Sequence, residues 1–597
     1  MIYPTLYARK RTQDTLDVFA GYNHNVRIPE GEFFDMKNLT SDLYPVLSPR
    51  KPRGLYLQGA NVQGMTAKDS LCYVDGSDFV INGHPVAMGL STEAEDCPKQ
   101  LVSMGAYVII LPDKKYINTA DISDFGNIEA ETVTSTAVSF TLCTMDGEHY
   151  GAEYIQAEEP AEPENMALWI DTSAVPHTLK QWSESSGMWV AIETTYVKIA
   201  SAGIGKAFAQ YDGITISGLK GVDLIDSVSG TEIPDTSDLV ELEGSAVIWA
   251  KEDDYIVVVG MLDMTRTISN PVTIARKMPK MDFIIESENR LWGCRYGLNN
   301  DGAFVNELYC CKLGDFRNWS CYMGVSTDSY AASLGTDGQF TGAITYGGHP
   351  LFWKENFLHT VYGQIPANFQ IQTTACRGVQ KGSERSLAIV GEILYYKARH
   401  AVCGYDGSLP TEVSAALGEE RYRNAVACAH GNKYYISMEK SDGTSQVLMV
   451  LDTAKGMWHK EDDLRAYLFC SCRDELYCAT EDGKILTMLG SGEGYEDRVE
   501  WMAETGIIGG SLPDSKYLVR LNIRMVLEMD SHATILVQYD SAEDWEELGF
   551  LTGTDLRSFT IPVRPRRCDH LRLRIEGDGK GMVFSITKTL TQGSDIT

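Results

Sequence analysis

The sequence predicts an all-β protein: a six- to seven-bladed β-propeller with an inserted β-rich domain and a C-terminal β-sandwich. Three observations predict this fold class. A short run of Leu or Tyr with an aromatic residue or Cys recurs about every forty residues, the last hundred residues alternate between apolar and polar, and helical periodicity is nearly absent. A repeat of this length, with β-type runs separated by glycine turns, is typical of propeller blades.

The repeat is clearest in the second half of the chain. Its cores begin at Leu351, Leu394, Tyr434 and Leu476, which are 43, 40 and 42 residues apart. Further hairpins begin near residues 71, 104 and 290, so we expect six or seven blades. The first blade must close against the last, because an open ring would leave sheet edges unpaired. The propeller is therefore assigned to residues 56–127 and 269–499.

Three other segments lack the repeat. Residues 1–55 are rich in turn-forming Gly and Pro and predict an extended N-terminal arm. Residues 128–268 predict an inserted β-rich domain, with an exposed acidic loop at 158–164. Residues 500–597 alternate with a period of two, which predicts a sandwich whose sheets each have one solvated face.

Composition limits the class of protein further. A chain of 597 residues is too long for a single core, and its formal charge of −30 argues against gripping nucleic-acid phosphates. No apolar run approaches the roughly 20 residues of a membrane helix. The N-terminus lacks the apolar core of a secretory signal, so we expect folding in a cytosol. The fourteen cysteines are then expected to be reduced and mostly buried.

No catalytic motif stands out. The acidic runs at residues 252–254 and 461–463 are predicted to be exposed loops, because a glycosidase needs two carboxylates across a cleft, one with a raised pKa. Residues 299–302 fit a hairpin turn better than a calcium loop. We expect no catalytic residues, no metal and no cofactor, and therefore not an enzyme.

Two sets of residues are candidates for binding. Basic clusters suggest docking onto an acidic partner, although solvated surface is the simpler interpretation; they comprise Arg50, Lys51, Arg53, Arg564, Arg566 and Arg567. Three tryptophans crowd the inserted domain: Trp169, Trp182 and Trp189. Hairpin or core packing is the simpler interpretation, and contact with a glycan or another surface is the alternative.

Two parts of the sequence carry a family resemblance. Near the N-terminus these are FAGYN at 19–23, IPEGEFFDMKNLT at 28–40 and YPVLSPR at 44–50; near the C-terminus they are QYDS at 538–541 and FTIPVRPRRCDH at 559–570. Both parts resemble a family of virion proteins of bacteriophages and prophages of Gram-positive gut bacteria. The layout is also similar to the propeller-bearing hub, nozzle or stabilisation proteins of short-tailed phages.

The resemblance implies a structural subunit of the phage tail or neck, made in the host bacterial cytoplasm and located in the virion. It implies a homo-oligomeric ring of about six copies that contacts portal, adaptor and tail-fibre proteins. Such a ring would extend the DNA channel, retain the genome and anchor fibres, with phage DNA passing without sequence-specific binding. A receptor- or carbohydrate-binding tail protein is the alternative, and a propeller glycosidase is a third.

Overall fold

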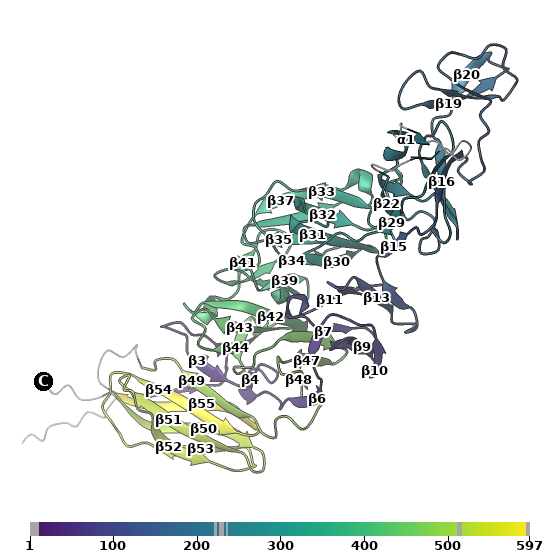
Figure 1. Ribbon diagram of the computed structural model, residues 1–597. Helices are drawn as coiled ribbons and strands as arrows, with labels where there is room; N and C mark the ends of the chain where they lie inside the picture. Colours follow the sequence, from purple (N-terminus) through teal and green to yellow (C-terminus); the bar gives the residue numbers. More distant parts are fainter. Residues whose placement is uncertain (1–10, 220–223, 226–231, 234–236, 510–515, 593–597) are drawn as a thin grey trace, which may run out of the picture.

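A computed structural model describes residues 11–219, 224–225, 232–233, 237–509 and 516–592. The protein is all-β, as predicted, and elongated. A sandwich lies at one end, a group of four-stranded sheets lies in the middle, and the inserted region projects at the other end (Figure 1). Among the described residues, no helix has the length and apolar character needed to cross a bilayer.

Seven antiparallel groups of four strands follow one another as blades; six are separate sheets, and blade 6 is part of a larger sheet. Blades 1 to 3 contain β7 (Val62–Ala67), β8 (Leu71–Asp75), β9 (Asp78–Ile81) and β10 (His84–Ala87); β11 (Gln100–Met104), β12 (Tyr107–Leu111), β13 (Lys115–Asn118) and β14 (Phe125–Asn127); and β30 (Phe283–Ser287), β31 (Arg290–Leu298), β32 (Phe304–Cys310) and β33 (Tyr330–Ser333). Blades 4 and 5 contain β34 (Phe340–Tyr346), β35 (His349–Lys354), β36 (Phe357–Tyr362) and β37 (Gln370–Ala375); and β38 (Ala388–Val390), β39 (Ile393–Lys397), β40 (Val402–Tyr405) and β41 (Thr411–Glu412). Blades 6 and 7 contain β42 (Tyr422–His430), β43 (Lys433–Lys440), β44 (Gln446–Asp452) and β45 (Met457–Lys460); and β46 (Leu468–Cys472), β47 (Glu475–Ala479), β48 (Lys484–Thr487) and β6 (Gly54–Gln58).

The blades contact one another in cyclic order. Each blade shares a cluster of buried apolar side chains with the next, and blade 7 shares one with blade 1, in which Cys470 and Val80 lie. Blade 7 takes its fourth strand, β6, from near the N-terminus. This is the arrangement of a β-propeller in which the first and last strands of the propeller segment, β6 and β48, pair in one sheet. The repeated sequence cores at Leu351, Leu394, Tyr434 and Leu476 all lie in the second strand of a blade.

The inserted region has its own core and a distal extension. One sheet contains β15 (Ala130–Val133), β29 (Thr273–Arg276), β22 (Gly213–Ser217) and β25 (Gly244–Val247). It packs on a second sheet of β26 (Ala250–Glu252), β27 (Tyr255–Val259), β21 (Tyr196–Ala200), β16 (Val138–Cys143) and β28 (Arg266–Ile268). A distal sheet contains β17 (Tyr154–Gln156), β18 (Leu168–Asp171), β19 (Thr178–Ser183) and β20 (Met188–Ala191). The expected boundary at residue 268 is too early, because β29 pairs with β15 and β22.

The C-terminal sandwich joins the propeller through one continuous sheet. Its outer layer contains β1 (Arg11–Leu16), β55 (Gly581–Gln592), β50 (Lys516–Leu527) and β53 (Arg557–Pro562). Its other layer contains β49 (Glu500–Thr505), β54 (Leu571–Asp578), β51 (His532–Tyr539) and β52 (Glu546–Leu551). This layer continues through β3 (Glu32–Lys37) and β2 (Gly21–Tyr22) into blade 6, which gives ten strands in one sheet.

The N-terminal arm, predicted to be extended, is part of the folded body. Strands β2 and β3 fill the space between β45 and β49, with Tyr22 paired to Trp458 and Phe33 paired to Thr505. Short β4 (Leu39–Thr40) and β5 (Ser48–Pro49) lead on to β6. Phe33, Tyr434 and Leu521 belong to one apolar cluster that spans the arm, blade 6 and the sandwich. Backbone pairing and a shared core thus make these parts one body.

Gly54→Ala tests how closely β6 packs against the backbone of Gly492. A Cβ at Gly54 would lie 2.2 Å from the backbone carbon of Gly492, so the strand must shift. We expect a loss of roughly 1–3 kcal/mol in the free energy of unfolding, as for overpacked cores. Urea denaturation followed by tryptophan fluorescence measures it. Gly335→Ala is the matched control, because a Cβ there meets open space; equal stability of both variants would contradict the close fit.

Candidate functional site

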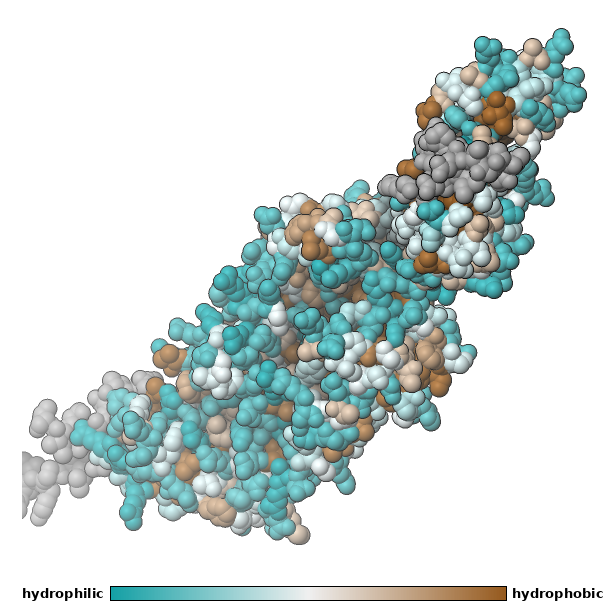
Figure 2. All heavy atoms as spheres, in the orientation of Figure 1, coloured by the Kyte–Doolittle hydropathy of each residue, from teal (hydrophilic) through white to brown (hydrophobic). Residues whose placement is uncertain are grey.

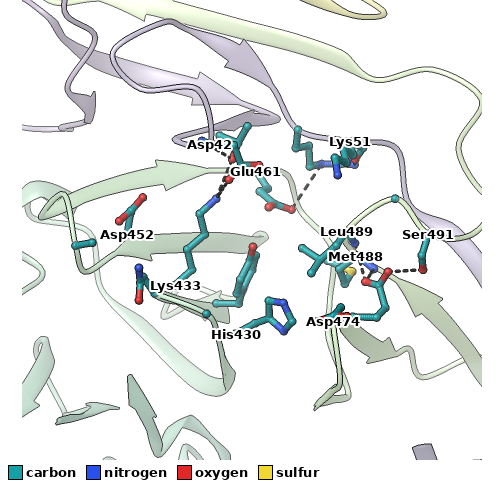
Figure 3. A pocket seen from close by; sticks show the side chains of 18 of the residues that line it. Asp42, Lys51, His430, Lys433, Asp452, Glu461, Asp474, Met488, Leu489 and Ser491 are labelled. Atoms are coloured by element: carbon teal, nitrogen blue, oxygen red, sulfur yellow. Dashed lines mark hydrogen bonds and ion pairs between the residues drawn. The ribbon is translucent and has the colours of Figure 1, made fainter. Parts of the chain in front are cut away.

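A polar cavity of about 660 Å³ opens where the N-terminal arm meets blades 6 and 7 (Figure 3). The arm supplies Thr40, Asp42, Arg50 and Lys51 to its wall. Hairpins of the two blades, and the segments that follow β45 and β48, supply the rest of the wall, including His430, Lys433, Asp452, Lys455, Glu461, Asp474, Glu475 and Ser491. The cavity therefore depends on packing of the arm against the propeller.

Two lysines neutralise two carboxylates in this cavity. Lys433 Nζ lies 2.5 Å from Asp42 Oδ1, and Lys455 Nζ lies 3.2 Å from Asp452 Oδ2. Burial opposes ionisation of Asp42, but the hydrogen bond and charge of Lys433 outweigh it, so the pKa of Asp42 is lowered. Burial likewise opposes ionisation of Asp452, but hydrogen bonds from Ser41 and Lys455 lower its pKa. Both carboxylates are ionised at neutral pH and are unsuited to general acid catalysis.

Glu475 is held as a fixed acceptor on the opposite wall. Its Oε1 accepts the backbone N–H groups of Leu476, Met488 and Leu489 at 3.0, 3.0 and 2.8 Å, and its Oε2 accepts the Ser491 hydroxyl. The carboxylate thereby fixes the chain where it leaves β48. Lys51 and Asp474 make no ion pair with any described residue and remain open to a ligand. Nothing in the described part of the chain gathers three or more His, Cys, Asp or Glu side chains as a metal site.

Arg50 and Glu461 of the cavity wall belong to a cluster of five charged residues, here named the arginine joint: Arg50, Arg53, Glu461, Asp462 and Glu496. Arg50, Arg53 and Glu461 are buried, and Asp462 and Glu496 are half-buried. Arg50 binds Glu496 through both terminal nitrogens, at 2.6 and 2.9 Å. Arg53, whose side chain is 1% exposed, donates to Glu461 at 2.7 Å and to Asp462 at 2.6 Å. The joint ties the arm to blade 6 and to the segment that enters the sandwich.

The carboxylates of the joint are held in their charged form. Burial raises the pKa of Asp462, but the charge and hydrogen bond of Arg53 outweigh it, and the pKa is lowered. Burial also opposes ionisation of Glu496, which the hydrogen bond from Arg50 overcomes. Such a cluster stabilises the fold only when complete, because removing one partner leaves a buried charge.

The joint corrects two expectations. Arg50 and Arg53 do not form a docking surface, because both are buried against carboxylates of the same chain. Glu461 and Asp462 do not lie on an exposed loop, because the arginines bury them; only Asp463 of that run is exposed. The basic run at residues 50–53 and the acidic run at residues 461–463 are both evident in the sequence. No local sequence pattern indicates that two segments about 410 residues apart form ion pairs with each other. Lys51 remains exposed beside the cavity.

The second basic cluster lies on the surface. Arg564, Arg566 and Arg567 follow β53 and are exposed. Arg566 pairs with Glu546 and lies 5.2 Å from the ring centre of Tyr539. No ion pair between Arg564 or Arg567 and another described residue occurs, so these two remain available for docking.

The three tryptophans meet on one face of the distal sheet. Trp189 packs edge-on against Trp169 and Trp182, with ring centres 5.3 and 5.5 Å apart. Trp169 is 4% exposed and donates its indole N–H to the carbonyl of Gln156. Trp169 is thus a core residue and not a glycan contact; Trp182 and Trp189 are half-buried. Rings tilted by more than 60° present no flat platform.

All fourteen cysteines are free; eleven are buried and three are half-buried. Burial raises the pKa of several of their thiols, for example Cys478 to about 12 and Cys403 to about 11. They therefore act as small apolar residues, as expected.

Comparisons with known proteins give no family. No protein-family model matches the chain, and no curated protein matches it. Similar solved structures include PorZ, a surface component of the type-IX secretion system of Porphyromonas gingivalis, at 11% identity and a TM-score of 0.24, covering 89% of this chain and 71% of that one. They also include BamB from Moraxella catarrhalis, at 9% identity and a TM-score of 0.23; the match covers 66% of this chain and 95% of that one. A third is an exo-beta-1,3-galactanase from Phanerochaete chrysosporium, at 8% identity and a TM-score of 0.21; the match covers 51% of this chain and 94% of that one. Structural similarity with TM-scores this low does not indicate a shared function.

Arg53→Ala should destabilise the protein strongly. It leaves Glu461 and Asp462 buried without their main partner, for which we expect a loss of about 3–5 kcal/mol in the free energy of unfolding. Denaturant titration measures this loss. Arg465→Ala is the control, because its pair with Glu481 is exposed and worth at most about 1 kcal/mol. A loss at Arg53 no larger than that at Arg465 would contradict the role of the joint.

Two buried histidines should make stability depend on pH between about 6.5 and 4. Burial lowers the pKa of His459 to about 3, with the charge of Lys433 adding to the effect, and lowers that of His359 to about 4. Both are neutral when folded and take up a proton near pH 6.5 when unfolded. The unfolded chain therefore binds about two more protons in this range, and the free energy of unfolding falls by about 2.7 kcal/mol per pH unit on acidification.

Replacing one of these histidines should halve that dependence. His459→Gln should reduce the slope by about 1.4 kcal/mol per pH unit, as measured by urea titrations between pH 6 and pH 5. His84→Gln, at an exposed position, should leave the slope unchanged. An unaltered slope in His459→Gln would show that His459 is not held neutral.

Proposed function

We propose that this protein is a rigid structural subunit of a phage tail or neck assembly, and not an enzyme. The observation that supports this most is the ten-stranded sheet, which runs from blade 6 through the arm to the far edge of the sandwich. A domain linked by a flexible tether turns freely, whereas strands in one hydrogen-bonded sheet keep a fixed orientation. A long body of fixed shape suits a part that sets distances between other proteins.

The charge of the chain agrees with such a role. In a ring of about six copies the acidic surface would repel DNA phosphates and let a genome pass without binding. The segments on which the resemblance to phage virion proteins depends contribute Arg50 of the arginine joint and the exposed Arg564, Arg566 and Arg567. The subunit would extend the DNA channel, retain the genome and anchor fibres.

The polar cavity fits the same proposal. Asp42 and Asp452 are already paired with lysines, and Glu475 is saturated by backbone N–H groups. The contacts of Asp42 with Lys433, and of Ser41 with Asp452 and Lys455, stabilise the contact between arm and propeller. Lys51 and Asp474 are left at the rim for a neighbouring protein.

Mass photometry of the purified protein, alone and with portal and adaptor proteins, tests the proposal. We expect a defined ring, either alone or on the partner complex, and the protein in purified phage particles by mass spectrometry. A chain that stays monomeric, joins neither partner and is absent from particles would contradict the structural role. Turnover of a glycoside by the purified protein would contradict it as well.

A further inference from the structure

The outer face of the sheet β1–β55–β50–β53 is basic in an otherwise acidic protein. Outward positions of β50 hold Arg520, Asn522 and Arg524, of which both arginines are exposed. Their cross-strand neighbours are hydroxyl-bearing residues and a proline: Pro562, Thr560 and Ser558 on β53, and Thr589, Thr587 and Ser585 on β55. On β1, Gln13 and Thr15 continue the same rows. None of these outward side chains is a carboxylate. We name this surface the arginine face.

The guanidinium groups of the arginine face make few interactions within the chain. Arg524 Nε donates to Ser558 Oγ at 3.2 Å, and Arg520 forms no ion pair with a described residue. Arg564 lies two residues beyond Pro562, the partner of Arg520, and is also exposed without an ion pair in the described chain. Asn522, between the two arginines, has a buried Oδ1 with no hydrogen-bond partner. That oxygen is an acceptor and is not open to solvent, so the unpaired donors that the face presents to an incoming acceptor are the guanidinium groups of Arg520, Arg524 and Arg564.

The opposite end of the molecule carries the complementary charge. The inserted region, residues 129–277, contains 24 acidic and 8 basic residues. Its distal loop between β17 and β18 exposes Glu158, Glu159, Glu162 and Glu164, which form no ion pair with described residues. Figure 1 places the distal sheet and the sandwich at opposite ends of the body, so one chain cannot bring these surfaces together.

We propose that the arginine face binds the acidic distal loop of a second copy of this chain. Guanidinium groups in a fixed row bind carboxylates through charge-assisted hydrogen bonds, and hydroxyl neighbours supply further donors. The distal sheet also exposes Met166, Met188 and Val190, 52–61% accessible, which supply apolar contact beside the loop. Figure 2 shows brown, apolar residues among the hydrophilic surface at this end.

The contact is heterologous, because two different surfaces of the chain meet. Repetition of such a contact closes a ring or extends a filament. The inference rests on the proposed function only in requiring that copies of the chain assemble with one another. Because both surfaces are exposed and charged, the association should weaken as salt rises.

Mass photometry of charge-reversal variants tests the contact. At low salt the wild-type protein should form multimers, which 0.5 M NaCl dissociates. R520E/R524E alone and E158K/E159K/E162K/E164K alone should each lose most of the multimer. Mixing the two variants should restore association in the form of heterodimers, because the intact arginine face of one variant meets the intact acidic loop of the other. K381E/R399E, which makes the same charge change at exposed propeller positions, should associate like wild type.

Several outcomes would overturn the contact. Multimers that persist in both variants would place self-association elsewhere and leave the proposed function standing. Loss without recovery on mixing would reject the pairing of these two surfaces. A wild-type protein that is monomeric at all salt concentrations would reject self-association, and incorporation into particles would then decide the proposed function separately. Duplex DNA bound by wild type and not by R520E/R524E, with no multimers, would assign the face to nucleic acid.

Discussion

The rest of the structure depends on the burial of Arg50 and Arg53 against Glu461, Asp462 and Glu496. These five residues come from the arm, from blade 6 and from the segment that enters the sandwich. Removing charges from water is unfavourable unless each has a partner in good geometry. The bidentate contact of Arg50 with Glu496 and the contacts of Arg53 with two carboxylates meet that condition. Three parts of the chain are thereby held in one arrangement.

The joint explains why the arm folds into the body. Arg50 and Arg53 lie in the chain between two paired strands: β6 follows them and belongs to blade 7, and β3 precedes them and lies between the propeller and the sandwich. The sandwich then continues a propeller sheet, so its orientation is set by backbone hydrogen bonds. The inserted region is different, because it leaves the propeller after β14, returns at β30 and has its own core. Acidic charge concentrates in that outlying part, and unpaired arginines lie at the other end.

Local patterns predicted much of this fold. The spacing of the cores around Leu351, Leu394, Tyr434 and Leu476 located second strands of blades, and period-two alternation located the sandwich. Both signals come from neighbouring residues, which share a strand. The joint was not predictable in the same way, because Arg53 and Glu461 are 408 residues apart in the sequence and are neighbours only in the folded structure. The basic and acidic runs were predicted to be solvated surface for the same reason, because their partners lie far away in the sequence. Hairpin or core packing is the simpler interpretation of Trp169, and the burial of its side chain agrees with that interpretation. The sequence alone does not distinguish Trp169 from the half-buried Trp182 and Trp189.

Hydrogen exchange of the backbone amides in β3 and β49 tests the central claim most directly. Amides in strands of one cooperative body exchange only when the whole body opens. The account predicts that β3 and β49 exchange as slowly as β43 in the propeller and β54 in the sandwich. Rapid exchange in β3 and β49, with β43 and β54 still protected, would show two bodies on a flexible link and contradict the account.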